Sequence, residues 1–459
     1  MTPTRTENLA RWCTALTYDD LPEPVIQRTK SLFVDWVGCA IAGRHHPAIA
    51  AIVAFSKQMG PASGKCEVVD AGVGTSSAAF AALVNGAASH VVEQDDLHNS
   101  SIVHPATVVF PAALAVAQEK GATGKEFITA CVVGYEVACR TGEYLGKTHY
   151  QNFHSTATAG TLGAAAAAAK LLNLDTDKML SALGTAGTQA AGLWQFLLDA
   201  THSKQVHTGK ACFDGIFAAY TAQSNLLGPR DVLEGKRGLG AVLVPSAPGA
   251  APTIPTAIDA RLGQKYSVLE SSFKWHASCR HTHPSVDALL KIVEKHDIQM
   301  ADIESVVARM YQAGIDVLSM SEQAETVHQS KFSMGFVLGV AAKYRRASIN
   351  DFTEEALRDG EIREFQPRVR MVLDERIDGR FPEEWTGCVT VTTKDGNSYT
   401  EDVEVVKGDP GDTLSWSELE SKMATLAHYA GITDLAPIKA VMKRVAGLES
   451  ESNVLGFQF

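Results

Sequence analysis

The sequence lacks the patterns typical of membrane proteins and nucleic-acid-binding proteins. No stretch of about 18 or more strongly apolar residues occurs, and the nearest, 157–172, is mostly alanine broken by Thr, Gly and Lys. No basic run is longer than residues 343–346, and 52 acidic against 41 basic residues give a net charge of −11. Nucleic acid and anionic membranes are therefore not expected partners.

Two further absences concern targeting and metal clusters. The N-terminus has neither the charged start nor the apolar core and cleavage site of a signal peptide. The eight cysteines include no CxxC pair, which argues against a zinc ribbon or an iron–sulfur cluster and for reduced, buried thiols. We expect a soluble, acidic, cytoplasmic protein.

Helical periodicity dominates the first 245 of the 459 residues. Apolar residues recur every three or four positions, and alanine and glycine fill many inward positions, which predicts closely packed helices. The expected helices are 25–40, 77–90, 106–119, 124–144, 156–172, 176–192 and 210–223.

The pattern changes near residue 245, where a Pro-, Ala- and Gly-rich stretch marks a boundary. Beyond it, helical patterns alternate with strand-like patterns, and residues 388–406 alternate on both sides of Asp395-Gly396, a strong hairpin signal. The sequence therefore predicts a mainly α fold. A large all-helical domain (1–264) is followed by an inserted smaller α+β domain (265–409) and a C-terminal return to the helical domain (410–459). The expected elements beyond residue 245 are helices 284–296, 332–344, 416–430 and 436–446 and strands 303–310 and 368–374.

A first cluster of polar residues contains Glu93, Asp95, Asp96, His98 and His104. Three carboxylates within four residues repel one another when buried, unless cationic neighbours or raised pKa values relieve them. A solvated loop is the plain alternative. Because apolar residues flank the run on both sides, we expect this loop to enter the core and form part of a site.

Two further clusters precede expected helices. His154 lies next to a helix N-terminus, where free N–H groups favour an anion, although Ser155 could simply cap the helix. Lys204 and His207 precede the expected helix from residue 210 and suit a carboxylate; a surface face of basic residues is an equally good interpretation.

The fourth cluster comprises His276, Arg280, His281 and His283. Arginine binds carboxylates through its planar fork, and histidine exchanges protons near neutral pH. A metal held by His281, His283 and Asp96 is a minority interpretation, because HExxH and the other short zinc signatures are absent. We expect no metal and no cofactor.

Together these clusters describe a pocket rich in His, Lys and Arg, which suits a small polycarboxylate. The chemistry open to such groups is proton removal from a carbon next to a carboxylate, followed by loss or return of a group. Lys and Arg would hold the carboxylates and stabilise enolate-like charge, while His moves protons.

The motifs in this order resemble the MmgE/PrpD family over nearly the whole chain. They are Asp35-Trp-Val-Gly-Cys-Ala-Ile-Ala-Gly43, the Glu93 to Pro105 loop, Phe153-His-Ser-Thr-Ala-Thr-Ala-Gly160, Lys204-x-x-His207-x-Gly209, Ser278-Cys-Arg-His-Thr-His283-Pro and Lys407-Gly-Asp-Pro410 with Trp416.

This family includes 2-methylcitrate dehydratase, cis-aconitate decarboxylase and iminodisuccinate epimerase. The resemblance implies a metal-free homodimer whose helical domain is interrupted by a lid domain. It also implies that His104, His154, Lys204 and His283 face the substrate. Glu93 stands where many members carry Asp.

We therefore expect a metal-independent lyase, first of all one that dehydrates a 2-methylcitrate-like hydroxy acid. Decarboxylation of cis-aconitate to itaconate and epimerisation of an iminodisuccinate-like diacid are the alternatives, followed by a metal-dependent hydrolase and a non-enzymatic carboxylate-binding protein. The expected catalytic residues are His104, His154, Glu93, Asp96 and Lys204. The expected substrate-binding residues are His98, His207, Arg280, His281 and His283.

Overall fold

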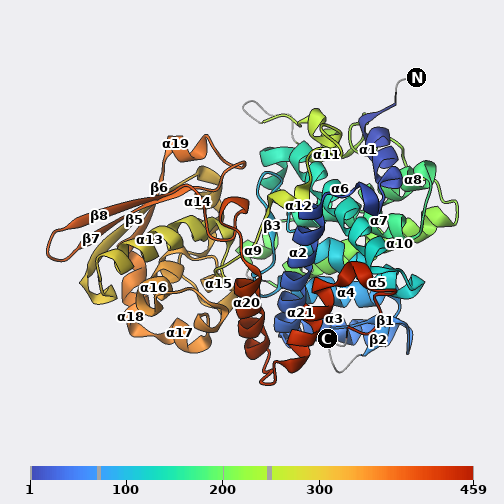
Figure 1. Cartoon of the computed structure of the whole chain (residues 1–459). Coiled ribbons are helices and arrows are strands. Elements are labelled where there is room, and N and C mark those ends of the chain that lie inside the picture. Colours follow the sequence, from blue (N-terminus) through green and yellow to red (C-terminus); the bar gives the residue numbers. More distant parts are fainter. Residues whose placement is uncertain (1–2, 70–73, 200, 245–250, 458–459) are drawn as a thin grey trace. The chain divides into compact units, whose positions relative to one another are not determined.

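The computed structural model of the chain describes residues 3–69, 74–199, 201–244 and 251–457. These form two compact units, which are treated separately below (Figure 1). The first unit comprises residues 1–196, 201–271 and 415–459, and the second comprises 197–200 and 272–414. The chain therefore leaves the helical unit, builds the second unit and returns.

Helices build the first unit. They are α1 (Arg5–Ala15), α2 (Glu23–Gly43), α3 (Pro47–Met59), α4 (Ala78–His90), α5 (Ala106–Lys120), α6 (Gly124–Tyr150), α7 (Ser155–Leu171), α8 (Thr176–Gly187), α10 (Ser203–Gln223), α11 (Leu239–Leu243), α12 (Ser267–Glu270), α20 (Trp416–Tyr429) and α21 (Ala436–Ala446). The short helix α9 (Gln195–Leu198) lies where the chain passes between the units. Two-residue strands of this unit are β1 (Cys66–Glu67), β2 (Thr75–Ser76) and β3 (Leu97–His98), and β4 (Ser271–Ser272) lies at the residue where the chain passes into the second unit.

Helix α7 lies at the centre of the first unit, packed against α5, α6, α8 and α10. Its alanine-rich sequence allows this, because small side chains let helix axes approach closely. At Gly163 a Cβ atom would lie 2.6 Å from the Cβ of Ala138 and 2.8 Å from the carbonyl oxygen of Gly134, both on α6. Replacement of this glycine would push the two helices apart. The tight packing fixes the N-terminus of α7, where His154 lies.

The second unit contains a four-stranded sheet of order β6-β5-β7-β8. Strands β5 (Ile303–Met310) and β6 (Val369–Leu373) are parallel, whereas β7 (Gly387–Thr393) runs antiparallel to β5 and to β8 (Ser398–Val403). Helix α13 (His283–Lys295) packs on β7 and β8, and α16 (Met334–Tyr344) packs on α13 (Figure 1). The smaller helices are α14 (Gln312–Leu318), α15 (Val327–Ser330), α17 (Glu354–Arg358), α18 (Gly360–Phe365) and α19 (Glu375–Asp378).

The mainly α prediction is confirmed, and so are the predicted strands and hairpin of the second unit. Three helix boundaries differ from prediction by more than three residues. Helix α10 begins at Ser203 rather than 210, α8 ends at Gly187 rather than 192, and α6 continues to Tyr150 through a kink at Gly146, which has φ 69°. The first difference matters for the site, because it places Lys204 and His207 one turn apart on the same helix.

All eight cysteines are buried and free, as predicted. In the described part of the chain, no single helix is long and apolar enough to cross a membrane; α2 and α3 pass by length and composition only as a pair, bent by 91° at their junction.

Candidate active site

Four histidines gather in the first unit. They come from the end of α4 (His90), the loop before α5 (His104), the residue that precedes α7 (His154) and the first turns of α10 (His207). The ring centres of His90 lie 4.9 Å from His104 and 5.5 Å from His154, and those of His154 and His207 are 5.4 Å apart. Three of the residue clusters seen in the sequence thus meet at one place.

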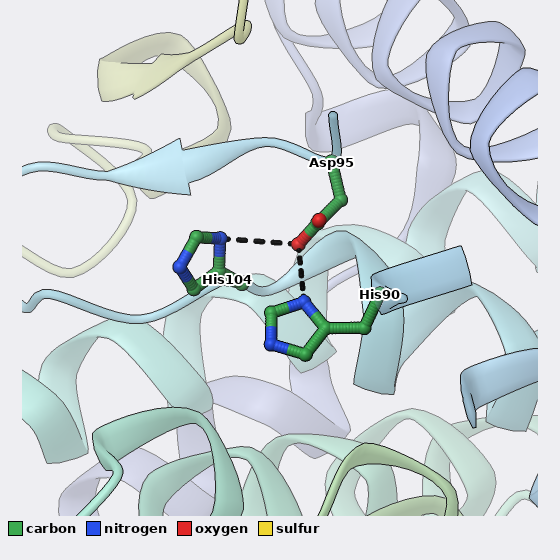
Figure 2. A group of neighbouring side chains, drawn as sticks. All are labelled: His90, Asp95 and His104. Atoms are coloured by element: carbon green, nitrogen blue, oxygen red, sulfur yellow. Dashed lines mark hydrogen bonds and ion pairs between the residues drawn. The ribbon is translucent and has the colours of Figure 1, made fainter. Parts of the chain in front are cut away.

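Asp95 joins two of these histidines (Figure 2). Its Oδ2 atom lies 2.8 Å from Nδ1 of His90 and 3.1 Å from Nδ1 of His104. Burial alone would raise the pKa of this carboxyl, but the attraction of His90 and His104 outweighs burial and holds the pKa well below its usual value. Since an ionised carboxylate only accepts hydrogen bonds, both Nδ1 atoms carry protons and donate them to Asp95.

His104 is held in one orientation. Its Nδ1 also lies 2.6 Å from the carbonyl oxygen of Asp96, and its backbone N–H donates to Oγ1 of Thr156 at 3.0 Å. Two acceptors therefore keep the proton on Nδ1, so Nε2 is the nitrogen that gains or loses a proton during chemistry. The His104 side chain is 12% exposed, whereas His90 is fully buried.

Asp96 lies beside His104 but turns its carboxyl elsewhere. Oδ1 accepts the backbone N–H of Ala106 at 2.9 Å, and Oδ2 accepts the Tyr135 hydroxyl at 2.8 Å. Burial raises the pKa of Asp96 to about 8, which these two hydrogen bonds only partly offset. The sequence analysis placed Asp96 among the expected catalytic residues. In the structure the carboxylate next to His104 is that of Asp95, and Asp96 contributes its backbone oxygen and holds the start of α5.

Glu93 and Lys204 form a buried ion pair. Glu93 has a positive φ of 57° and is 1% exposed, and Lys204 on α10 is 3% exposed. The same loop is tied down by Lys422 of α20, whose Nζ donates to the carbonyl oxygen of Gln94 at 2.7 Å. These contacts hold the loop in place. The loop enters the core, as predicted from the apolar residues on both sides of it.

His154 and His207 are neutral at neutral pH. Burial lowers the pKa of His207 to about 4, and burial together with the neighbouring His207, His90 and Lys204 lowers that of His154 well below its usual value. The rings of Trp194 and Phe196 lie 5.4 Å and 6.2 Å from that of His154. One side of the cluster is therefore apolar and aromatic, and the other is ionic.

His98, a predicted substrate-binding residue, lies in a separate group within the first unit. Its Nδ1 is 2.9 Å from Oγ of Ser101, and its Nε2 is 3.5 Å from Oε2 of Glu270. Burial opposes ionisation of Glu270, but hydrogen bonds from His98 and Lys265 outweigh it and lower the pKa to about 2. These contacts give His98 a structural role where the loop meets α12.

The fourth cluster lies in the second unit. Arg280 forms a buried ion pair with Asp409, and its Nη1 donates to Nδ1 of His283 at 3.2 Å. Nε2 of His283 donates to the carbonyl oxygen of Ser278 at 3.3 Å. Burial, followed by the charge of Arg280, lowers the pKa of His283 well below its usual value, so this ring is neutral.

His276 joins this network, whereas His281 does not. Nε2 of His276 lies 2.7 Å from Oδ1 of Asp287, and its ring centre is 5.1 Å from that of His283. His281 instead stacks on Trp385 at 4.7 Å, and its Nδ1 lies 2.8 Å from the Tyr311 hydroxyl. The sequence predicted that His281 binds substrate; in the structure it is part of the aromatic core of the second unit.

Two groups of side chains have the spacing of a metal site: His90, Asp95 and His104, and His98, Glu143 and Glu270. In the first, both histidine nitrogens direct protons at Asp95, and an ion would have to displace both. In the second, Nζ of Lys265 already lies 2.8 Å from Glu270 and 3.6 Å from Glu143. Hydrogen bonds and ion pairs account for both groups without an ion.

The sequence interpretation assigned no role to His90, Asp95 or Lys422. In the sequence, His90 falls within the expected helix 77–90, and Asp95 belongs to the first cluster without a role of its own. The spacing of five residues between His90 and Asp95 across a helix end was a usable signal, since it allows the aspartate to fold back on the histidine. Lys422 is separated from the loop by more than 300 residues, and nothing in the local sequence indicates the contact.

Comparison with known proteins covers both units. Residues 7–250 match the MmgE/PrpD N-terminal domain and residues 276–446 the MmgE/PrpD C-terminal domain. A cis-aconitate decarboxylase-like protein of Aspergillus oryzae is 27% identical over 98% of this chain and 95% of its own length. The cis-aconitate decarboxylases of Aspergillus terreus and Homo sapiens are each 26% identical, over 98% and 97% of this chain and 94% and 92% of their own lengths. The chain belongs to the MmgE/PrpD family.

Proposed function

We propose that this protein is a lyase that acts on a small polycarboxylate by transferring a proton at a carbon next to a carboxylate. The observation that carries the proposal is the placement of His104. Its Nδ1 proton is held by Asp95 and by the Asp96 carbonyl, which leaves Nε2 to exchange protons. Lys204, His154 and His207 gather on the same part of the unit and suit carboxylate groups.

Decarboxylation of a cis-aconitate-like acid is the first reaction to test, because relatives named for it match this chain over nearly its whole length. In this reaction the bond from carbon to one carboxylate breaks, CO₂ leaves, and the remaining carbanion takes a proton from His104. Lys204 would stabilise the negative charge that develops on a neighbouring carboxylate.

Dehydration of a 2-methylcitrate-like acid is the second candidate. It needs a base that takes the proton from carbon and an acid that gives one to the leaving hydroxyl, so that water departs. The neutral pair of His154 and His207 beside the proton-donating His104 supplies both kinds of group. The position of the substrate between the His154–His207 pair and His104 decides which of the two reactions the protein favours.

The test is a proton-NMR assay in deuterated water with citrate, 2-methylcitrate, cis-aconitate and iminodisuccinate as substrates. Decarboxylation would give itaconate carrying deuterium from solvent, and dehydration would give a new vinyl or methyl signal. His104→Asn should keep the fold but lower turnover about 100- to 10,000-fold, the usual range for loss of a general acid. Absence of turnover and of solvent exchange with all four acids would refute the proposal.

A further inference from the structure

A buried carboxylate is shared by two histidines in the first unit (Figure 2). Oδ2 of Asp95 accepts hydrogen bonds from Nδ1 of His90 and Nδ1 of His104, and its side chain is fully buried. Among the described residues, Oδ1 of Asp95 has no hydrogen-bond partner. The whole negative charge of this carboxylate is therefore satisfied through the two imidazoles.

His90 takes only one role in this arrangement. Its Nδ1 donates to Asp95 at 2.8 Å, while its Nε2 is buried and has no hydrogen-bond partner within the described ranges. A proton on Nε2 would be a buried donor without an acceptor, which carries a penalty of about 1–3 kcal/mol, and more for a charged group. Within the described ranges, the polar contact of the His90 ring is therefore the hydrogen bond that its Nδ1 donates to Asp95.

Asp95 and His90 affect the acidity of His104 in opposite directions. The negative charge of Asp95 favours the positively charged form of His104, because opposite charges attract strongly in a buried place. The hydrogen bond from His90 draws electron density from the same oxygen and so weakens that attraction. Asp95 thus holds the proton on His104, and His90 limits how tightly it is held.

We propose that His90 and Asp95 are positioning residues that set the orientation and the acidity of His104 for the proton transfer. They act through His104 and do not need to touch the substrate. This inference rests on the proposed function, in which Nε2 of His104 exchanges the proton. It adds two residues to the site and gives each a distinct and opposite effect.

Other titratable groups face the same region and must be considered in a pH experiment. From the loop they are Asp96 and Glu93; from the residue before α7, His154; and from α10, Lys204 and His207. None of these residues is substituted in the variants below.

The experiment follows the titration of His104 directly, by NMR of protein labelled with ¹³C at the histidine Cε1 atoms and without substrate. The His104→Asn protein identifies the signal. Asp95→Asn removes the negative charge and should lower the titration midpoint of His104 by about 1–3 pH units. His90→Phe removes one hydrogen bond to Asp95 and should raise the midpoint by up to about one unit, the equivalent of one hydrogen bond.

A conservative variant separates a hydrogen-bonding role from a packing role. In His90→Asn the amide can donate from the position of Nδ1, so the midpoint should return toward the wild-type value. His149→Phe is a matched control. This histidine is equally buried, but its Nε2 faces Oγ1 of Thr158 at 3.1 Å. His149→Phe should leave the titration midpoint of His104 unchanged.

The same variants are then assayed for turnover against pH. The limb of the profile at which His104 loses its proton should move down in Asp95→Asn and up in His90→Phe. Variants that lose activity while the His104 titration stays unchanged would overturn the proposal, since that is the behaviour of a merely structural pair. If the titration shifts as expected but wild-type protein turns over no polycarboxylate, the proposed function fails and the coupling stands.

Discussion

Nδ1 of His154 lies 3.2 Å from Nδ1 of His207. One Nδ1 must donate the hydrogen bond and the other must accept it, so the two rings cannot both carry a positive charge in this geometry. Burial, together with the neighbouring basic groups His90 and Lys204, explains why neither ring carries a charge near pH 7. The two rings are therefore neutral before a ligand binds. A carboxylate that binds beside them favours protonation of one ring.

We predict that binding of a polycarboxylate takes up about one proton at neutral pH, because negative charge beside the pair favours its protonated form. Tricarballylate, a saturated tricarboxylate, serves as an unreactive probe. Calorimetric titrations in phosphate and in Tris should give binding enthalpies that differ by the ionisation enthalpies of these buffers. His207→Gln should reduce the difference. Equal enthalpies in the two buffers would contradict this prediction.

We predict that Lys204→Met destabilises the protein by about 3–5 kcal/mol, because it removes the cation that forms an ion pair with the buried Glu93 carboxylate. The double variant Lys204→Met/Glu93→Gln should recover most of the free energy of unfolding in urea. It should not recover turnover, since the positive charge for the substrate carboxylate is still missing.

A matched control for this pair lies on the same helix. Lys210 pairs with Asp214, but the Lys210 side chain is 49% exposed. Lys210→Met should change stability by less than about 1 kcal/mol. Equal losses of unfolding free energy in Lys204→Met and Lys210→Met would contradict the prediction, because burial of the Lys204–Glu93 pair would then make no difference.

We predict that Asp96 makes the protein less stable as pH rises from about 4 to about 8. Burial raises the pKa of Asp96 in the folded protein from 3.8 to about 8, so in this range the folded state holds a proton that the unfolded state releases. Asp96→Asn keeps groups that can pair with Tyr135 and the Ala106 amide but does not titrate.

The free energy of unfolding of Asp96→Asn relative to wild type should therefore increase with pH, by up to about 1.4 kcal/mol per pH unit for one proton. Urea unfolding at pH 5, 6, 7 and 8 measures this difference. His154 and His207 contribute the opposite slope below pH 6.5, but equally in both proteins, so they cancel. Parallel stability curves would refute the prediction.

We predict that a second copy of the chain covers an apolar patch formed by Phe55, Phe80, Phe213 and Phe217. Phe55 and Phe217 are 49% and 47% exposed, and ring centres connect Phe55 to Phe80 at 6.1 Å and Phe80 to Phe213 at 5.6 Å. An exposed aromatic patch of this kind marks an interaction surface.

Light scattering after size exclusion should show a dimer for the wild type and a smaller species for Phe217→Glu. Val242→Glu changes a single exposed apolar residue, 66% exposed, and should leave the mass unchanged. A wild-type monomer, or a Phe217→Glu dimer as stable as the wild type, would contradict the prediction.

The sequence by itself determined the mainly α fold, the hairpin around Gly396 and the family, because helical periodicity, strand alternation and motif order are local or collinear properties. It also predicted His104, His154 and Lys204 as catalytic residues and His207 as a substrate-binding residue, and the structure brings these four together in the first unit. It misplaced the start of α10, since Lys204 and His207 look like loop residues when the packing of α10 on α4 is unknown.

Only the tertiary structure decided which acid acts on which base. Asp95 and Asp96 are adjacent and chemically identical, yet Asp95 lies between two histidines and Asp96 caps a helix. The direction of each side chain depends on the path of the loop, which is held by Lys422 from a distant helix and by Tyr135 from α6. Both carboxyls are buried, and the two histidines beside Asp95, which come from different parts of the chain, separate its pKa from that of Asp96. The spacing of residues along the sequence therefore names the candidates, and packing in three dimensions assigns their charge and their partners.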